Sequence, residues 1–212
     1  MKNLPLLLGT IFGTILLVVV VAAIFSKGSD PVVVDQKVLM NNVHLVKGPT
    51  TAKVTVVEFG DMQCPACGSV EPLVEQLIAK HPNDVQFVFR QFPLVSVHKN
   101  AQISAQAVEA AASMNIDTFW KLHNYLYANQ PDWSELSNAD VLKKFGEYAD
   151  KLQIDKVELM KRIESQEVKD KIATDVGDAN KLGVDGTPTF YVNGQKTLAP
   201  QLDSTVESFL AK

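Results

Sequence analysis

The sequence predicts an α/β domain in which a block of helices separates two parts of one sheet. An apolar run, a helical pattern and a second apolar run follow one another from Val54 to Phe92. Two short apolar runs and a closing helical pattern occupy the stretch from Thr189 to Leu210. The element order is therefore β-α-β, a helical block, then β-β-α. Apolar residues make up 46% of the 212-residue chain, which is enough to form a substantial core.

The first β-α-β unit has the clearest pattern. The apolar run 54–59 predicts a strand covered on both faces, and the run 85–92 predicts the next strand. Between them, a proline that suits the first helical position opens a helix over 65–80, which Pro72 should bend. We expect one face of this helix to point inward, with residues Val70, Leu73, Val74, Leu77 and Ile78.

Capping residues and turn residues predict the helical block and the last strands. Helices are expected over 101–114, 117–128 and 139–152, then from 155 to about 182 in two pieces. Asn138 and Asp155 are the predicted N-caps, with Val157, Met160 and Ile163 of the helix after Asp155 facing inward. Gly183 is predicted to end the last of these helices. Asn193-Gly194 predicts a tight hairpin between strands over 189–192 and 195–198.

The N-terminus differs from the rest of the chain. An uncharged apolar segment from Leu4 to Phe25 is long enough to cross a bilayer, and predicts a membrane anchor over 1–26. A cleaved signal peptide is the alternative, although its apolar region would normally be shorter. Residues 27–50 are expected to form a tether with a possible first strand, and 51–212 the folded domain, with the helical insertion at about 96–182.

The chain contains two cysteines, Cys64 and Cys67, spaced C-x-x-C where a strand-like run meets a helix-like one. A thiol pair at this spacing can close to a disulfide and so exchange two electrons. The unpaired N–H groups at the start of a helix favour a Cys64 thiolate. A zinc site and an inert disulfide are the alternatives, but zinc would need two further ligands that no second motif supplies.

Two more residues stand out around this pair. Glu58 is the one charge in an otherwise apolar strand, where burial would raise its pKa and let it exchange a proton with Cys67. The alternative is an ordinary solvated carboxylate. Pro188, in Gly186-Thr187-Pro188, precedes a strand, where a cis peptide bond would be unusual; a simple turn proline is the alternative.

Taken together, these residues resemble the thioredoxin superfamily, specifically its DsbA-like group with a helical insertion, of the membrane-tethered bacterial type. The resemblance covers the chain from Val54 to the C-terminus. It rests on the C-x-x-C at the helix start, the acidic residue six positions before Cys64, Pro72 within the helix, and Gly-Thr-Pro before the third strand. It implies a thioredoxin-like fold with a central mixed sheet flanked by helices.

The resemblance also implies roles for these residues. Cys64 would be the exposed attacking sulfur, Cys67 the resolving thiol and Glu58 the buried proton acceptor. Pro188 in cis would lie against the disulfide.

The backbone of Thr187 would pair with an extended segment of the substrate. Pro65 and Ala66, between the cysteines, would also contact the substrate. Strongly oxidising members of the group carry histidine where this chain has Ala66, so a less oxidising potential is expected here.

The function that this resemblance implies is thiol-disulfide exchange, most simply as a disulfide donor to exported proteins. An isomerase or a tethered reductase of the same fold, or a peptide-binding holdase, is the alternative. The expected partners are exported proteins with free thiols, a redox partner such as a quinone-linked membrane oxidase, and the membrane itself. The catalytic domain would be extracytoplasmic, or secreted if the N-terminal segment is cleaved. No cofactor beyond the cysteine pair is expected, and a net charge of −4 argues against nucleic acid.

Overall fold

The computed structural model describes residues 13–18 and 33–212. Residues 13–18 are helical, whereas most of the predicted anchor over 1–26 lies outside the described residues. Within the two described ranges, no helix has both the length and the apolar composition needed to cross a bilayer. The unit that begins at Val33 is described below by itself.

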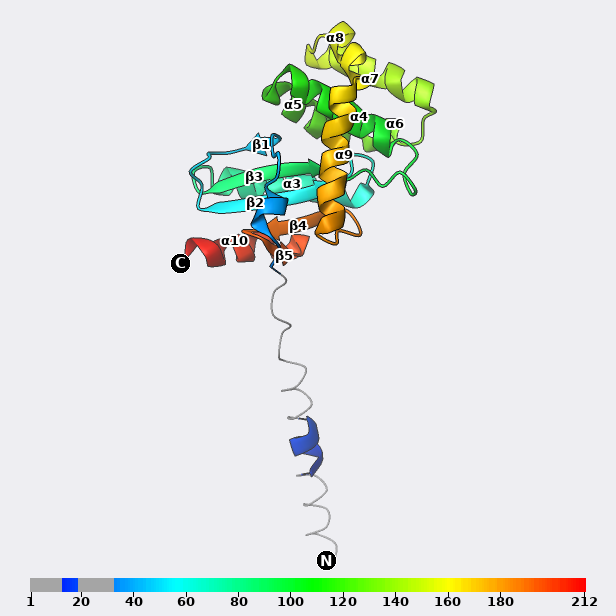
Figure 1. Cartoon of the computed structure of the whole chain (residues 1–212). Helices are drawn as coiled ribbons and strands as arrows, with labels where there is room; N and C mark the ends of the chain where they lie inside the picture. Colours follow the sequence, from blue (N-terminus) through cyan, green and yellow to red (C-terminus); the bar gives the residue numbers. More distant parts are fainter. Residues whose placement is uncertain (1–12, 19–32) are drawn as a thin grey trace, which may run out of the picture. The chain divides into compact units, whose positions relative to one another are not determined.

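A five-stranded mixed sheet forms the centre of this unit (Figure 1). Its order is β1-β3-β2-β4-β5, with β2 and β3 parallel and the other neighbouring pairs antiparallel. The strands are β1 (Val46–Lys47), β2 (Val54–Gly60), β3 (Val85–Gln91), β4 (Thr189–Val192) and β5 (Gln195–Thr197). The mixed sheet expected from the thioredoxin resemblance is therefore confirmed.

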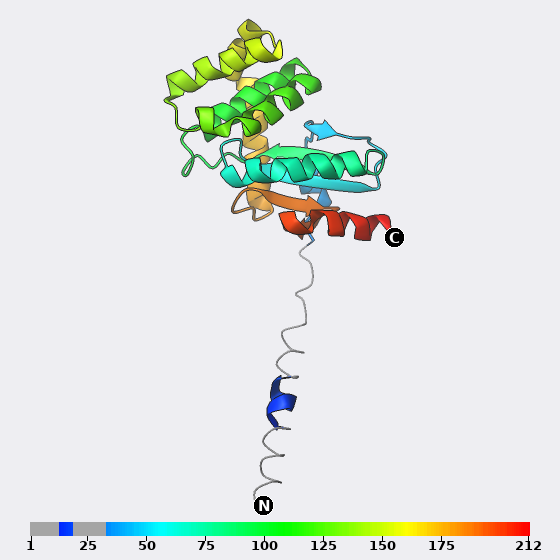
Figure 2. The same ribbon diagram turned by 180° about the vertical axis from the view of Figure 1, so that it is seen from behind.

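Helices cover both faces of the sheet, which explains the apolar sequence of β2. Strand side chains alternate, so Val54 and Val56 pack on one face while Val57 and Phe59 pack on the other. The first face is covered by α3 (Pro65–Lys80) and α10 (Leu202–Leu210), which lie in front of the sheet in Figure 2. The second face is covered by α2 (Gln36–Leu39) and α9 (Gln166–Lys181).

The helical insertion lies between β3 and β4 and forms the upper part of Figure 1. Its core joins the core on the α3 side of the sheet, through buried residues such as Phe119, Leu122 and Trp133. Its helices, apart from α9, are α4 (Ala101–Met114), α5 (Ile116–Ala128), α6 (Gln130–Trp133), α7 (Asn138–Leu152) and α8 (Lys156–Ile163). A short 3-10 helix, Ala199–Gln201, precedes α10.

Residues 27–50 were expected to form a tether with a possible first strand. The described part of this range, 33–50, packs on the domain and contains β1. Leu39 of α2 is 1% exposed, and β1 is one of the two edge strands of the sheet. One contact that holds them there comes from Arg90 of β3, which is buried and donates to the carbonyl groups of Val38 and Leu39, at 3.0 Å each. The same guanidinium pairs with two aspartates of α9, Asp175 and Asp178. A charged group on the buried face of the sheet thus fixes α2 and α9 together.

Several local predictions are confirmed and three are corrected. Asn193 and Gly194 both have positive φ in the β4–β5 hairpin, as the Asn-Gly pair predicts. The N-cap of α7 is Ser137, whose side chain accepts from Asp140 N, rather than Asn138. Val157, expected to face inward, is 80% exposed on α8, and Leu73 of α3 is only partly covered. In both cases other residues of the same helix form its buried face, Leu159 and Ile163 on α8 and Val74 and Leu77 on α3.

Candidate active site

The cysteine pair lies at the turn from β2 into α3, where the sequence places it. Cys64 is the N-cap of α3, and Pro65 occupies the first helical turn. Cys64 is 6% exposed and Cys67 is fully buried, while Pro65 and Ala66 between them are exposed. Both cysteines are free thiols. Cys64 is thus more accessible than Cys67, but less exposed than the resemblance implies, because the loop at Thr187 lies over it.

Cys64 is set up to ionise. Its Sγ lies 3.4 Å from the Thr187 carbonyl oxygen, and the following peptide bond to Pro188 is cis. The hydrogen bond from the Cys67 thiol is the main cause that lowers the pKa of Cys64, to about 5. Burial opposes this shift, whereas the Thr187 side chain and the N–H groups of Cys67 and Ala66 add to it. At neutral pH Cys64 is therefore mostly a thiolate.

The pKa values of Cys67 and Glu58 are raised, in contrast to that of Cys64. Burial, the hydrogen bond to Cys64 and the charge of Glu58 all raise the pKa of Cys67, so it stays a thiol. Glu58 is 1% exposed and both of its carboxylate oxygens lack a hydrogen-bond partner. Burial, with the charges of Glu71 and Cys64, raises its pKa well above 4.5. The two groups are electrostatically coupled, and Glu58 is favoured in its protonated form.

Glu71 of α3 is a buried carboxyl that sequence reasoning missed. It is 7% exposed, and burial followed by the charge of Glu75 raises its pKa to about 7. Its Oε1 has no hydrogen-bond partner and lies 3.7 Å from Nδ1 of His123. The sequence did contain a signal for Glu71: it is an acidic residue one turn after Cys67, on the inward face of the helix.

Three polar side chains hold the cysteine loop in place. The sequence analysis assigned no role to them. Gln130 of α6 donates to the carbonyl oxygens of Met62 and Cys64, at 2.8 and 3.0 Å. Gln63 donates to the Ser134 carbonyl oxygen at 2.7 Å. Asp61 is 1% exposed and accepts from Gln63 N at 2.8 Å. The helical insertion is therefore bonded directly to the reactive turn.

Two histidines near the cysteine turn, His98 and His123, have different environments. His98 is hydrogen-bonded through Nδ1 to Asp61 at 2.8 Å. His123 is fully buried among aromatic rings, with Phe89 and Tyr127 edge-on at 4.7 and 4.8 Å. Burial lowers the pKa of His123 to about 4, so it packs as a neutral ring.

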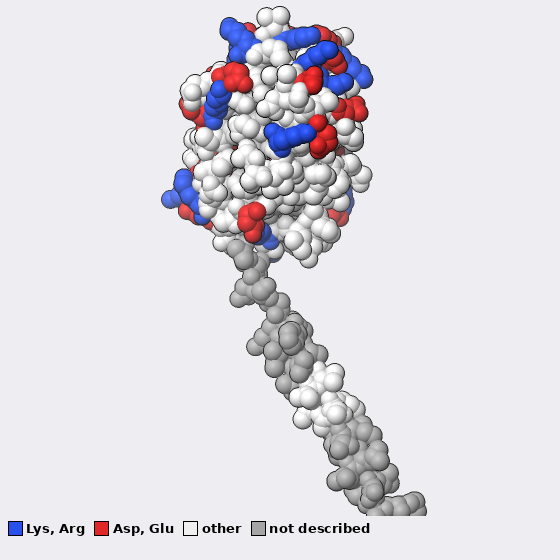
Figure 3. Space-filling view, turned by 90° about the vertical axis from the view of Figure 1, so that its right-hand side faces the viewer, with Lys and Arg blue, Asp and Glu red and all other residues white. Residues whose placement is uncertain are grey.

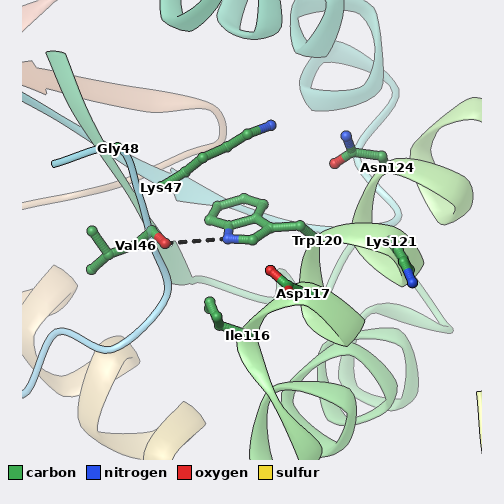
Figure 4. Close-up of a pocket in the computed structure, with 8 residues that line it drawn as sticks. All are labelled: Val46, Lys47, Gly48, Ile116, Asp117, Trp120, Lys121 and Asn124. Carbon is green, nitrogen blue, oxygen red and sulfur yellow. Dashed lines mark hydrogen bonds between the residues drawn. The ribbon is translucent and has the colours of Figure 1, made fainter. Parts of the chain in front are cut away.

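A pocket of about 550 Å³ lies between β1 and α5, and contains none of the predicted site residues (Figure 4). The Trp120 indole N–H donates to the Val46 carbonyl oxygen at 3.2 Å and so covers the free edge of β1. The Lys47 ammonium lies 5.5 Å from the Trp120 ring centre and also pairs with Glu75. Trp120 and Lys47, which line the pocket, therefore have structural roles at the edge of β1.

Charged groups of both signs are interspersed on the face shown in Figure 3. This face is the right-hand side of Figure 1, toward which the parallel strands β2 and β3 point. Between the charges at its upper end and those at its lower rim, much of the surface is uncharged. The cysteine turn follows the end of β2, so it opens on this side.

One cluster of three candidate metal ligands occurs within the described ranges, and it does not include the cysteines. It consists of His81, Asp203 and Glu207, and the ammonium of Lys80 already pairs with both acidic groups at 2.8 Å.

Comparisons with known proteins agree with this geometry. The thioredoxin family model matches residues 41–212. The oxidised crystal structure of BdbD from Bacillus subtilis superimposes with a TM-score of 0.71 at 25% identity, covering 87% of this chain and 100% of that one. A Bacillus cereus protein named "Probable disulfide bond formation protein D" is 32% identical over 210 residues, which cover 96% of this chain and 94% of that protein.

A third similarity concerns a larger protein. Na(+)/H(+) antiporter NhaA 3 of Salinispora tropica is 41% identical over 155 residues, which cover 73% of this chain. The matched segment spans only 22% of the antiporter, so the two share a domain and not their whole length.

Proposed function

The chain belongs to the thioredoxin-like family of thiol-disulfide oxidoreductases, and on that basis we propose that it is a DsbA-like disulfide donor with the active site Cys64-Pro65-Ala66-Cys67. The observation that carries this proposal is the geometry of the turn, in which Cys64 is the N-cap of α3 and lies beside the buried Cys67 thiol. The hydrogen bond from that thiol lowers the pKa of Cys64 to about 5. A stable Cys64 thiolate stabilises the reduced protein and makes Cys64 a good leaving group. Both effects favour passing the disulfide on to another protein.

The exchange begins when a thiolate of a client protein attacks Sγ of Cys64 in the Cys64–Cys67 disulfide. A bond forms between the client sulfur and Cys64, and Cys67 leaves with the electron pair. Because the pKa of Cys67 is raised, its sulfur takes up a proton, and protonated Glu58 is the buried acid available to supply it. The negative charge then resides on Glu58 until solvent returns a proton.

A second client thiolate completes the reaction by attacking the client sulfur of the mixed disulfide. Cys64 leaves as a thiolate, which is stable because of its low pKa. The client has then lost two electrons and gained a disulfide, and the protein holds two reduced cysteines.

Thr187, Pro65 and Ala66 are proposed to contact the client during this reaction, and Pro188 to lie against the disulfide. Pro65 and Ala66 are exposed beside Cys64, and the Thr187 carbonyl oxygen lies next to its Sγ. An extended client segment could therefore bond to the backbone of Thr187 while its sulfur approaches Cys64.

The setting of the reaction is part of the proposal. We infer exported proteins with free thiols as clients, and an extracytoplasmic catalytic domain tethered by the N-terminal apolar segment. A quinone-linked membrane oxidase would restore the disulfide. The apolar composition of residues 4–25 and the name of the Bacillus cereus relative support this assignment. The cysteine pair is the redox group, and no other cofactor is proposed.

Oxidation of a reduced, unfolded client tests the proposal. The oxidised protein, mixed with reduced ribonuclease A, should remove two client thiols for each Cys64–Cys67 disulfide consumed. Thiol titration measures this ratio, and the Cys64→Ala, Cys67→Ala double variant is the control. If client thiols persist while the protein readily reduces the disulfides of insulin, the reductase alternative is correct.

A further inference from the structure

The Gln130 side chain of α6 places both donors of its amide on the cysteine turn. Its Nε2 lies 2.8 Å from the Met62 carbonyl oxygen and 3.0 Å from the Cys64 carbonyl oxygen. Because an NH₂ group carries two N–H donors and a carbonyl oxygen only accepts, each N–H serves one of these carbonyls. The Cys64 carbonyl oxygen also accepts the first bond of α3, from Gly68 N at 3.1 Å. One neutral side chain therefore bonds to the backbone where the turn becomes a helix.

Gly68 leaves the space that the Gln130 amide occupies. A Cβ atom at position 68 would lie 2.6 Å from Oε1 of Gln130 and 2.9 Å from its Cδ. The backbone at Gly68 is helical and its φ is not positive, so the local conformation does not require glycine. Glycine inside a helix is less stable than alanine. The close approach of Gln130 accounts for glycine directly after Cys67.

The other end of this contact is fixed as well. Gln130 begins α6, whose Trp133 is fully buried. The Ser134 carbonyl oxygen, just after α6, accepts from Gln63 Nε2 at 2.7 Å and from Asn100 Nδ2 at 3.0 Å. Asn100 is itself fully buried. Movement of α6 away from the cysteine turn would break these bonds, so Gln130 is held in place.

The backbone that Gln130 holds carries groups that stabilise the Cys64 thiolate. The Cys67 thiol is the main cause of the low pKa of Cys64, and the N–H groups of Cys67 and Ala66 add to it against the effect of burial. These N–H groups belong to the first turn of α3, so their direction toward Sγ depends on the backbone position of Cys64. A disulfide sulfur is uncharged and gains much less from such donors than a thiolate does. The Gln130 contact therefore stabilises the reduced form more than the oxidised form.

We propose that Gln130 is a positioning residue for thiol-disulfide exchange, which holds the start of α3 so that its N–H groups stabilise the Cys64 thiolate. This inference rests on the proposed function, because a more stable thiolate makes Cys64 a better leaving group. The helical insertion thereby helps to set how oxidising the cysteine pair is. It does so through a neutral amide, whose own charge does not change with pH.

Two variants and two matched controls test the proposal. Gln130→Ala removes the amide. Gly68→Ala keeps the amide but places a Cβ where it lies, and this variant should fold, because the displaced atoms are the end of a flexible side chain. Gly177→Ala is its control, because a Cβ at this position of α9 meets nothing within 4 Å. Gln76→Ala, at an exposed glutamine of α3, is the control for Gln130→Ala.

The ultraviolet absorbance of the thiolate as a function of pH measures the ionisation constant of Cys64. Glutathione buffers at neutral pH measure the equilibrium between dithiol and disulfide. Gln130→Ala and Gly68→Ala should each lower the ionisation constant about threefold, part of the value of one neutral hydrogen bond. The equilibrium should shift toward the disulfide by about the same factor, because at neutral pH the reduced form carries the thiolate and the disulfide does not.

The two changes should also depend on each other. Gly68→Ala acts by displacing the amide, so adding it to Gln130→Ala should change neither constant further. Both controls should match wild type. An equal shift in Gly177→Ala and Gly68→Ala would contradict the proposal, because the effect would then come from helix stability and not from Gln130.

Unchanged ionisation and an unchanged glutathione equilibrium in the test variants would overturn the proposal, even if urea unfolding showed a loss of stability. Such a result would mean that Gln130 is a structural contact alone. Gly68→Ala decides the matter if Gln130→Ala fails to fold. Failure of the proposed function has a different signature. In that case the wild-type disulfide would be as stable as that of a reductase, while the test variants would still shift both constants.

Discussion

Replacing Cys67 by serine is expected to trap the reaction halfway, while replacing Cys64 by serine should abolish it. In Cys67→Ser the Cys64 thiolate can still attack one sulfur of a client disulfide, and the other client sulfur leaves. No second thiol is present to cleave the new bond, so the mixed disulfide accumulates. In Cys64→Ser the remaining thiol is fully buried and its pKa is raised, so exchange should fall at least about a thousandfold.

Mass spectrometry of the unreduced reaction measures this difference. Cys67→Ser should give a species with the summed mass of protein and client, which a reductant removes, and Cys64→Ser should give none. Ala66→Gly is a suitable control, because it changes the same turn and keeps both thiols. An adduct that forms through Cys67 and not Cys64 would reverse the assignment of the attacking sulfur.

Replacing Glu58 by leucine should stabilise the reduced protein and slow exchange. The buried carboxyl has no hydrogen-bond partner, so its removal should raise the free energy of unfolding by about 1–3 kcal/mol at neutral pH. The same change removes the acid proposed to return a proton to Cys67. The rate of exchange should therefore fall about a hundredfold.

The pH dependence of stability gives a second measure of Glu58. Its folded-state pKa is raised above 4.5, so its stabilising contribution is complete below that pH and is lost as the pH rises through the folded value. Urea unfolding from pH 4 to pH 8 should show wild type weakening relative to Glu58→Leu as the pH rises. The variant Glu58→Gln keeps the shape of the side chain but cannot ionise, so it separates the effect of ionisation from the effect of shape. Parallel pH curves for wild type and Glu58→Leu would mean that Glu58 ionises as freely as in the unfolded chain.

The sequence was sufficient to predict the strands β2 to β5 and the turn that carries the cysteines, because each is a local pattern. The apolar run of β2, the Asp155 cap of α8, Gly183 after α9 and the Asn-Gly hairpin each depend on only a few neighbouring residues. Cys64, Cys67 and Glu58 could be proposed as site residues because each is unusual in its own segment. The motif Gly-Thr-Pro could be singled out in the same way.

The connections between segments could not be predicted from local patterns. Arg90 resembles an ordinary strand cation, yet it turns residues 33–50 from a tether into part of the domain by binding carbonyl groups about 50 residues away in sequence. Asp61, beside the cysteine turn, is bonded to His98, which is 37 residues away in sequence. Gln130 is bonded to Met62 and Cys64, which are 68 and 66 residues away. Nothing near them in the sequence indicates their partners, which only the folded chain brings together.

The equilibrium reduction potential of the Cys64–Cys67 couple, measured in glutathione buffers, tests the central claim most directly. The Cys64 pKa of about 5 lies between the values of about 3.5 for DsbA and about 7 for thioredoxin, and Ala66 adds no positive charge. A disulfide donor with this thiolate should have a potential between about −120 mV, the value of DsbA, and about −200 mV. A value near about −270 mV, that of thioredoxin, would show that the oxidised form is the stable one, and would contradict the account.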